Sequence, residues 1–80
     1  MELKQYDEAF SVLHQLEKED PENIEKTSSF LEDNYFKVRN EKPEYREKAK
    51  IYASRRRKVS AQANHHYEIL AREEKQQQQN

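Results

Sequence analysis

The stretch that decides the fold is PEYREKAKIYASRRRKVSAQANHHYEILAREEK, residues 43–75. From Tyr45 onward, a heptad series with alternating spacings of four and three residues runs through Tyr45, Ala49, Tyr52, Arg56, Val59, Ala63, His66 and Leu70. Such a series keeps one stripe of a helix turned toward a partner. Because no glycine or proline follows Pro43, we predict one helix over about 43–74, roughly 50 Å long at 1.5 Å per residue.

Two shorter helices are predicted ahead of it. Apolar residues recur at helical spacing over about 2–18, which predicts an amphipathic first helix. Asp20 and Pro21 favour a second helix over about 21–39, because aspartate caps helix N-termini and proline suits the first helical position. Connections this short make consecutive helices antiparallel neighbours. We therefore predict an all-α three-helix bundle, with two antiparallel shorter helices packed on a long, coiled-coil-like C-terminal helix.

The composition indicates one small helical domain, residues 1–75, and a disordered glutamine-rich tail, residues 76–80. Of the 80 residues, 32% are apolar and 39% are charged, so the core is thin and self-association would add stability. No apolar run approaches the roughly 20 residues that span a bilayer, and the N-terminus has no signal-peptide core. We expect a soluble, cytoplasmic protein.

The residue types exclude several kinds of active site. The chain has no glycine and no cysteine, so it lacks the means for phosphate-cradling loops, nucleophile elbows and thiolate sites. His65 and His66 are adjacent, and adjacent helical residues point about 100° apart, which is unsuitable for chelating one metal ion. We therefore predict a protein that is not an enzyme and binds no metal or cofactor.

The C-terminal part of the predicted long helix is the first candidate site. It extends past the shorter helices by several turns, so its apolar side chains need a covering molecule. The predicted partner-binding residues are Val59, Ala63, His66, Tyr67, Ile69 and Leu70. Tyr67 and Leu70 would be the anchors. The sequence thus predicts a protein–protein interaction module, an adaptor, regulator or assembly factor, which binds another protein or a second copy of itself as a symmetric dimer.

A basic run, Arg55-Arg56-Arg57-Lys58, provides the alternative site. Residues 1–34 carry three Lys against ten Asp and Glu, a net charge of −7, whereas residues 35–80 carry twelve Lys and Arg against six, a net charge of +6. This asymmetry indicates either a surface for nucleic acid or acidic helices packed against a basic one. The phosphate-binding residues would be Arg46, Lys50, Arg55, Arg57 and Lys58. Asn64, the nearby candidate for reading a base, lies two turns away along the predicted helix.

Two polar residues occupy the heptad stripe itself. Arg56 requires a carboxylate or another anion there, because an unpaired buried charge is costly. It either pairs with an acidic residue of the first two helices or binds an external anion. His66 is predicted to fix the packing register as a polar residue in an apolar seam.

Overall fold

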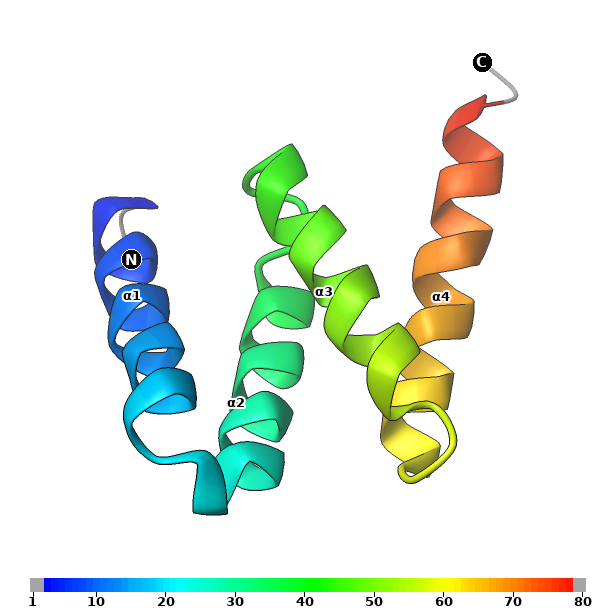
Figure 1. The fold of residues 1–80 in the computed structure, drawn as a ribbon. Coiled ribbons are helices and arrows are strands. Elements are labelled where there is room, and N and C mark those ends of the chain that lie inside the picture. Colours follow the sequence, from blue (N-terminus) through cyan, green and yellow to red (C-terminus); the bar gives the residue numbers. More distant parts are fainter. Residues whose placement is uncertain (1–2, 79–80) are drawn as a thin grey trace.

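In a computed structural model of the protein, which describes residues 3–78, all regular structure is helical. The elements are α1 (Leu3–Glu19), a short 3-10 helix η1 (Pro21–Asn23), α2 (Ile24–Lys37), α3 (Pro43–Arg56) and α4 (Ala61–Gln78). Figure 1 shows the four α-helices following one another across the molecule in alternating directions. The all-α prediction is confirmed, but residues 3–78 form four α-helices where three were predicted.

The predicted long helix over 43–74 is wrong, because the chain turns back between Arg56 and Ala61. The amides of Val59 and Ser60 both donate to the Arg56 carbonyl, at 3.1 and 3.0 Å, which closes the end of α3. Ser60 then caps α4: its Oγ accepts from the Ala63 amide at 3.3 Å. A serine side chain can satisfy a free amide in this way and so begin a new helix.

Burial explains why the turn is preferred to a continuous helix. Folding back packs α4 on α3 and buries Ala63, His66 and Leu70 at 0%, 6% and 0% exposure. Full burial of one leucine side chain contributes roughly 2 kcal/mol, and a serine cap about 1 kcal/mol. A straight helix would forfeit both. Apart from Val59, which is 70% exposed in the turn, and Arg56, which is partly exposed, the heptad residues are therefore buried within one chain, and the overhanging helix end that needed an external cover is absent.

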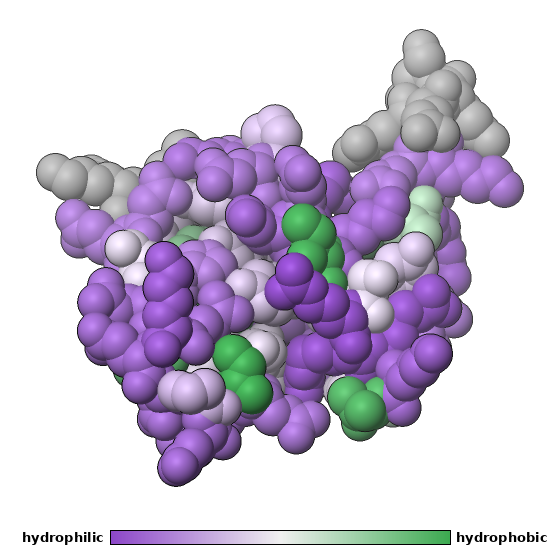
Figure 2. All heavy atoms as spheres, viewed as in Figure 1, coloured by the Kyte–Doolittle hydropathy of each residue, from purple (hydrophilic) through white to green (hydrophobic). Residues whose placement is uncertain are grey.

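The helices form a serial array. α2 packs against α1 and α3, and α3 packs against α2 and α4. Side chains also reach past the nearest neighbour, since α1 bonds to α3 through Asp7 and Tyr45, and α2 bonds to α4 through Glu32 and His66. The Cα atoms extend over 42 × 32 × 16 Å, so the molecule is thin in one direction. The face drawn in Figure 2 is mainly hydrophilic, with apolar residues in separate patches.

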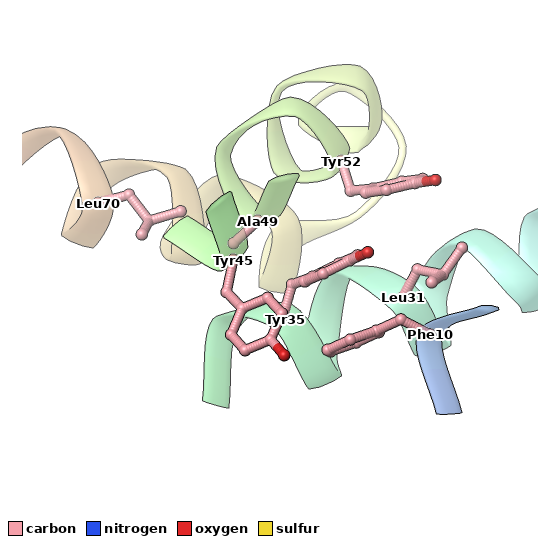
Figure 3. Packing of buried hydrophobic residues seen from close by; sticks show 7 residues of the cluster. All are labelled: Phe10, Leu31, Tyr35, Tyr45, Ala49, Tyr52 and Leu70. Atoms are coloured by element: carbon pink, nitrogen blue, oxygen red, sulfur yellow. The ribbon is translucent and has the colours of Figure 1, made fainter. Parts of the chain in front are cut away.

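The core is built largely from aromatic rings. Its buried members are Phe10, Leu31, Tyr35, Tyr45, Ala49, Tyr52 and Leu70 (Figure 3). Tyr35 lies at the centre, and its ring stacks on Phe10 at a centroid distance of 3.7 Å. The planes of the Tyr35 and Tyr52 rings are inclined by 14° to each other. Parallel and tilted aromatic pairs of this kind add about 1 kcal/mol beyond area burial. A chain poor in leucine and isoleucine thus obtains its interior from tyrosine.

Polar residues of α1 bind the hydroxyl groups of the core tyrosines. Tyr45 donates to Asp7 at 2.6 Å and Tyr52 donates to Glu17 at 2.9 Å, while His14 Nε2 lies 2.7 Å from the Tyr35 hydroxyl. Burial raises the pKa of Tyr35 to about 12. Burial and the hydrogen bond to Asp7 likewise raise the pKa of Tyr45 to about 12.

Three further predictions concern the C-terminal end, membrane-spanning segments and the link between the first two helices. α4 continues through Gln78, past the predicted end at 74, and residues 79–80 of the predicted tail lie outside the described residues. No helix within 3–78 has the length and apolar character needed to cross a membrane. The link between α1 and α2 is the predicted break, with Pro21 opening η1 directly after Asp20. The expected cap is absent, because the Asp20 carboxylate accepts from the Asn23 side-chain amide at 2.8 Å and from no backbone amide of the first turn.

Candidate nucleic-acid interface

The five cations predicted to bind phosphate fall into two groups. Arg46 and Lys50 face α4 and are neutralised there: Arg46 Nη2 lies 2.7 Å from Glu73 Oε1, and Lys50 Nζ lies 2.6 Å from Glu74 Oε2. Arg39 adds a second guanidinium to Glu73, at 2.9 Å. The two arginines lower the pKa of Glu73 to about 2. Arg46 and Lys50 therefore hold the α3–α4 pair together.

Arg56 pairs within the fold, as the first of the two alternatives for this residue required. Its Nη1 donates to Glu32 Oε1 at 2.6 Å, and the other oxygen of that carboxylate lies 2.6 Å from His66 Nδ1. Glu32 is 1% exposed, and the His66 ring stacks on Phe36 at 4.0 Å. The buried Glu32 carboxylate thus joins α2 both to the last residue of α3 and to α4. These bonds fix the position of the basic run on the surface.

The remaining three cations, Arg55, Arg57 and Lys58, surround one hollow at the α3–α4 turn. The hollow has a volume of about 600 Å³ and is completed by Ser54 and Asn64; we call these five residues the basic hollow. No carboxylate lines it, and within 3–78 none of its three cations forms an ion pair. A concentration of unneutralised positive charge around a concave surface attracts anions.

Arg57 is held in position by two contacts from α4. Its Nε donates to Asn64 Oδ1 at 3.1 Å, and its guanidinium carbon lies 4.1 Å from the centre of the Tyr67 ring. A guanidinium stacked on an aromatic face keeps its remaining N–H groups free to bind phosphate oxygens in pairs. Fixing the side chain in advance lowers the entropy cost of binding.

A second hollow, of about 390 Å³, lies beside the first. The two share Ser54 and Arg55. The second adds Ile51 and Tyr67 as apolar and aromatic walls, and Lys50 and the Glu47 carboxylate complete it. Arg55 also covers the Tyr52 ring at 5.6 Å. Together the hollows place cations next to an aromatic side chain along one side of the α3–α4 pair.

The six residues predicted to bind a protein partner are divided by the turn. Ala63, His66 and Leu70 lie in the interior between α4 and its neighbours. Val59 is 70% exposed in the turn, and Tyr67 and Ile69 are half-buried. The set does not form one surface, because the predicted continuous helix on which it was based does not exist.

Asn64 is the functional candidate whose position the sequence misplaced most. On a continuous helix it lies two turns beyond the arginines, but the turn brings its side chain to Arg57. Ser54 was also missed, since nothing in its local sequence distinguishes it from other helical serines. The signal that could have located both is Ser60, which is a favoured residue at the start of a helix.

The comparisons with known proteins are negative. No protein-family model, curated protein or solved structure matches this chain.

The residues around the turn offer charge and hydrogen-bond donors. In the described part of the chain, no three His, Asp or Glu side chains group closely enough to hold a metal ion. The basic hollow offers hydrogen-bond donors and positive charge, but it is lined by no carboxylate or histidine that could serve as a general base. Its positive charge and hydrogen-bond donors are of the kind that can bind an anion.

Proposed function

We propose that the protein is a non-enzymatic nucleic-acid-binding protein, and that the basic hollow contacts the phosphate backbone. The observation that supports this most directly is the contrast between neighbouring cations. Arg39, Arg46, Lys50 and Arg56 each have a carboxylate partner, whereas the three cations of the hollow have none among residues 3–78. Phosphate contacts by Lys and Arg supply most of the affinity in non-specific nucleic-acid binding.

Asn64 and Tyr67 give the hollow more than charge. Asparagine can read base edges, and tyrosine can stack on an unpaired base. The Asn64 carbonyl is bonded to Arg57, which leaves its amide N–H groups to donate outward. A stacked guanidinium can form paired hydrogen bonds with the two non-bridging oxygens of a backbone phosphate.

The test is a titration of fluorescent single-stranded and duplex DNA at several salt concentrations. Neutralising three phosphates gives a slope of log K against log salt of about −2.1 for a single strand and about −2.7 for a duplex. For a duplex the affinity should fall about 40-fold between about 50 and about 200 mM salt. A slope near zero, or equal affinity for polyglutamate, would overturn the proposal.

A charge-matched pair of variants makes the test specific to the site. The triple variant Arg55→Gln/Arg57→Gln/Lys58→Gln should lose at least about tenfold in affinity. The control, Lys18→Gln/Lys26→Gln/Arg72→Gln, removes three exposed positive charges elsewhere and should keep most of the affinity. Equal losses in the two variants would mean that overall charge, and not the hollow, governs binding.

A protein–protein interaction module is the second candidate function. It is supported by exposed apolar side chains on α1 and α2, among them Phe30, which is 49% exposed. Exposed apolar patches that include large side chains are typical of interaction sites.

A further inference from the structure

An apolar groove runs between α1 and α2, on a part of the molecule separate from the basic hollow. It has a volume of about 360 Å³ and lies between Tyr6, Ala9 and Leu13 of α1 and, on the other side, Asn34 of α2 and Val38 just after that helix. α1 is the first helix of the array and packs against α2 on one side. The groove therefore has no further helix of the described chain over it.

Exposed apolar side chains lie on both helices that form the groove. Val12 and Leu16 of α1 are 62% and 40% exposed, and Phe30 of α2 is 49% exposed. At 100° per residue, Leu16 lies 20° from Ala9 and 60° from Leu13 around the circumference of α1. Val12 lies next to Leu16, on the side away from the groove. The apolar surface of the groove thus continues over the outside of α1.

Charged residues border this surface with the same spacing on both helices. Glu8 and Glu19 stand four residues before and seven residues after Val12, and so share its side of α1. Lys26 and Lys37 stand four before and seven after Phe30 on α2. All four are exposed. One border of the surface is therefore acidic and the other is basic.

The two borders are also matched in height. Phe10 stacks on Tyr35, and because α1 and α2 are antiparallel, each step forward along one helix matches a step back along the other. Two residues back from Phe10 and two forward from Tyr35, Glu8 and Lys37 lie at the same height along the helix axes. Nine residues in the opposite directions, Glu19 and Lys26 do so too. Lys37 pairs with Asp33 at 3.1 Å, but with 66% of its side chain exposed this pair is weak and exchangeable.

We propose that a second copy of the chain covers this face, related to the first by a two-fold axis that runs along the groove. That axis places α1 of each copy over α2 of the other at the same height, so Glu8 meets Lys37 and Glu19 meets Lys26, twice each. An axis across the groove would place α1 on α1 and oppose like charges, which is unfavourable. The proposal deepens the interaction-module candidate by naming its partner and surface, and it is independent of the basic hollow.

Mass in solution, measured by light scattering from about 10 µM to about 1 mM, provides the first test. The wild-type chain should pass from monomer toward dimer over this range. Phe30→Asp, with helicity checked by circular dichroism, should weaken dimerisation at least about tenfold by placing a charge in the contact. Val59→Ser is the matched control, because it removes an exposed apolar residue at the α3–α4 turn, outside the face. A wild-type monomer throughout, or a dimer that Val59→Ser abolishes and Phe30→Asp leaves intact, overturns the proposal.

A charge exchange tests the direction of the axis without altering any apolar residue. Glu8→Lys/Glu19→Lys has two basic borders, and Lys26→Glu/Lys37→Glu has two acidic borders. Neither variant should dimerise alone, but an equimolar mixture should form a one-to-one heterodimer. Self-association of either variant to the wild-type extent would contradict the axis.

The outcome separates the second copy from other occupants. If the chain stays monomeric while Phe30→Asp abolishes capture of a different protein, the self-association proposal fails and the interaction module stands. If neither dimerisation nor capture occurs, both fail. Neither outcome bears on the proposed DNA binding, because the residues of the basic hollow lie at the α3–α4 turn and not on α1 or α2.

Discussion

Glu32 Oε2 lies 2.6 Å from His66 Nδ1, although 34 residues separate the two in the chain. The other oxygen of the same carboxylate accepts from Arg56, also at 2.6 Å. Only 2% of the Glu32 side chain is exposed. A carboxylate buried this deeply is stable only when good hydrogen-bond geometry offsets its loss of water. Glu32 therefore requires the turn that brings Arg56 and His66 to it.

Glu32→Gln should lower the free energy of unfolding by about 3 kcal/mol, because it leaves Arg56 without its counter-charge in a mostly buried position. Urea denaturation followed by far-UV circular dichroism measures the change. Glu25→Gln, an exposed position on the same helix, is the control and should change stability by less than about 0.5 kcal/mol. Equal effects in the two variants would mean that Glu32 is not buried between its two partners.

Ser60→Ala should lower stability by about 1 kcal/mol, since the Ala63 amide loses its acceptor at the start of α4. Ser60→Asp should retain most of the stability, because aspartate is an equally good cap and favours the positive end of the helix dipole. Thermal unfolding of the three proteins checks the order. If Ser60→Ala were the most stable of them, position 60 would lie inside a continuous helix.

A zero-length carbodiimide cross-link between Lys50 and Glu74 should form in high yield, because Nζ and Oε2 lie 2.6 Å apart. On a continuous helix, 24 residues would separate the same groups by roughly 36 Å along the axis. Peptide mass spectrometry identifies the product. Lys50→Arg keeps the charge and removes the reactive amine, so the cross-link should vanish in that variant while the fold persists.

The fold should lose stability as the pH rises from about 10 toward about 12. The folded-state pKa of Tyr35 and of Tyr45 is raised to about 12 from 10.0, chiefly by burial. A raised pKa means that the stabilisation is complete below pH 10, and is lost as the unfolded chain releases protons that the folded chain retains. Phenolate absorbance and circular dichroism should change together. Full ionisation of all tyrosines near pH 10 with unchanged helicity would contradict the buried hydroxyls.

Acid should weaken the α3–α4 pair between about pH 4.5 and about pH 2. The pKa of Glu73 is lowered from 4.5 to about 2 by Arg39 and Arg46, so its stabilising effect is present above pH 4.5 and disappears as the pH falls toward 2. Glu73→Gln should be less stable than wild type at pH 7 and should approach it at pH 2. A constant difference between the two proteins across this range would exclude the charge of Glu73 as the cause.

The heptad series marked side chains of 43–75 that pack on a partner, but the sequence misplaced that partner for Ala63 and Leu70, which were expected to need a covering molecule and instead pack within the chain. Tyr45, Ala49, Tyr52, Ala63 and Leu70 all belong to the heptad series and all lie in the interior. The break at Arg57–Ser60 left no glycine or proline to mark it, and Ser60 is equally acceptable within a helix. The turn is favoured by burial that only the three-dimensional arrangement supplies, and local propensity is a weaker effect than burial.

The charges of the candidate interface could not be predicted from local sequence for the same reason. The basic run identified the cations, but local sequence could not say which of them are neutralised. Glu73 and Glu74 reach Arg46 and Lys50 only because α4 returns along α3. That return also removes Ala63, His66 and Leu70 from the predicted partner-binding surface. Pairing across 24 or more residues depends on the fold, and single-sequence periodicity carries no information about it.

The polar attachment of α1 has a consequence for how the molecule opens. Among the described side chains of α1, only Phe10 is fully buried, and Tyr6 and Leu13 pack on the core while partly exposed. The helix is also held by polar contacts, since Asp7 and Glu17 accept hydrogen bonds from core tyrosines and His14 bonds to the Tyr35 hydroxyl. Segments with few buried apolar contacts are the first to unfold locally and to exchange their amide hydrogens. Release of α1 would uncover Tyr35, Tyr45 and Tyr52 while α2, α3 and α4 stayed joined through Glu32 and Glu73. We therefore expect the loss of this one helix to expose the aromatic interior before the whole fold is lost.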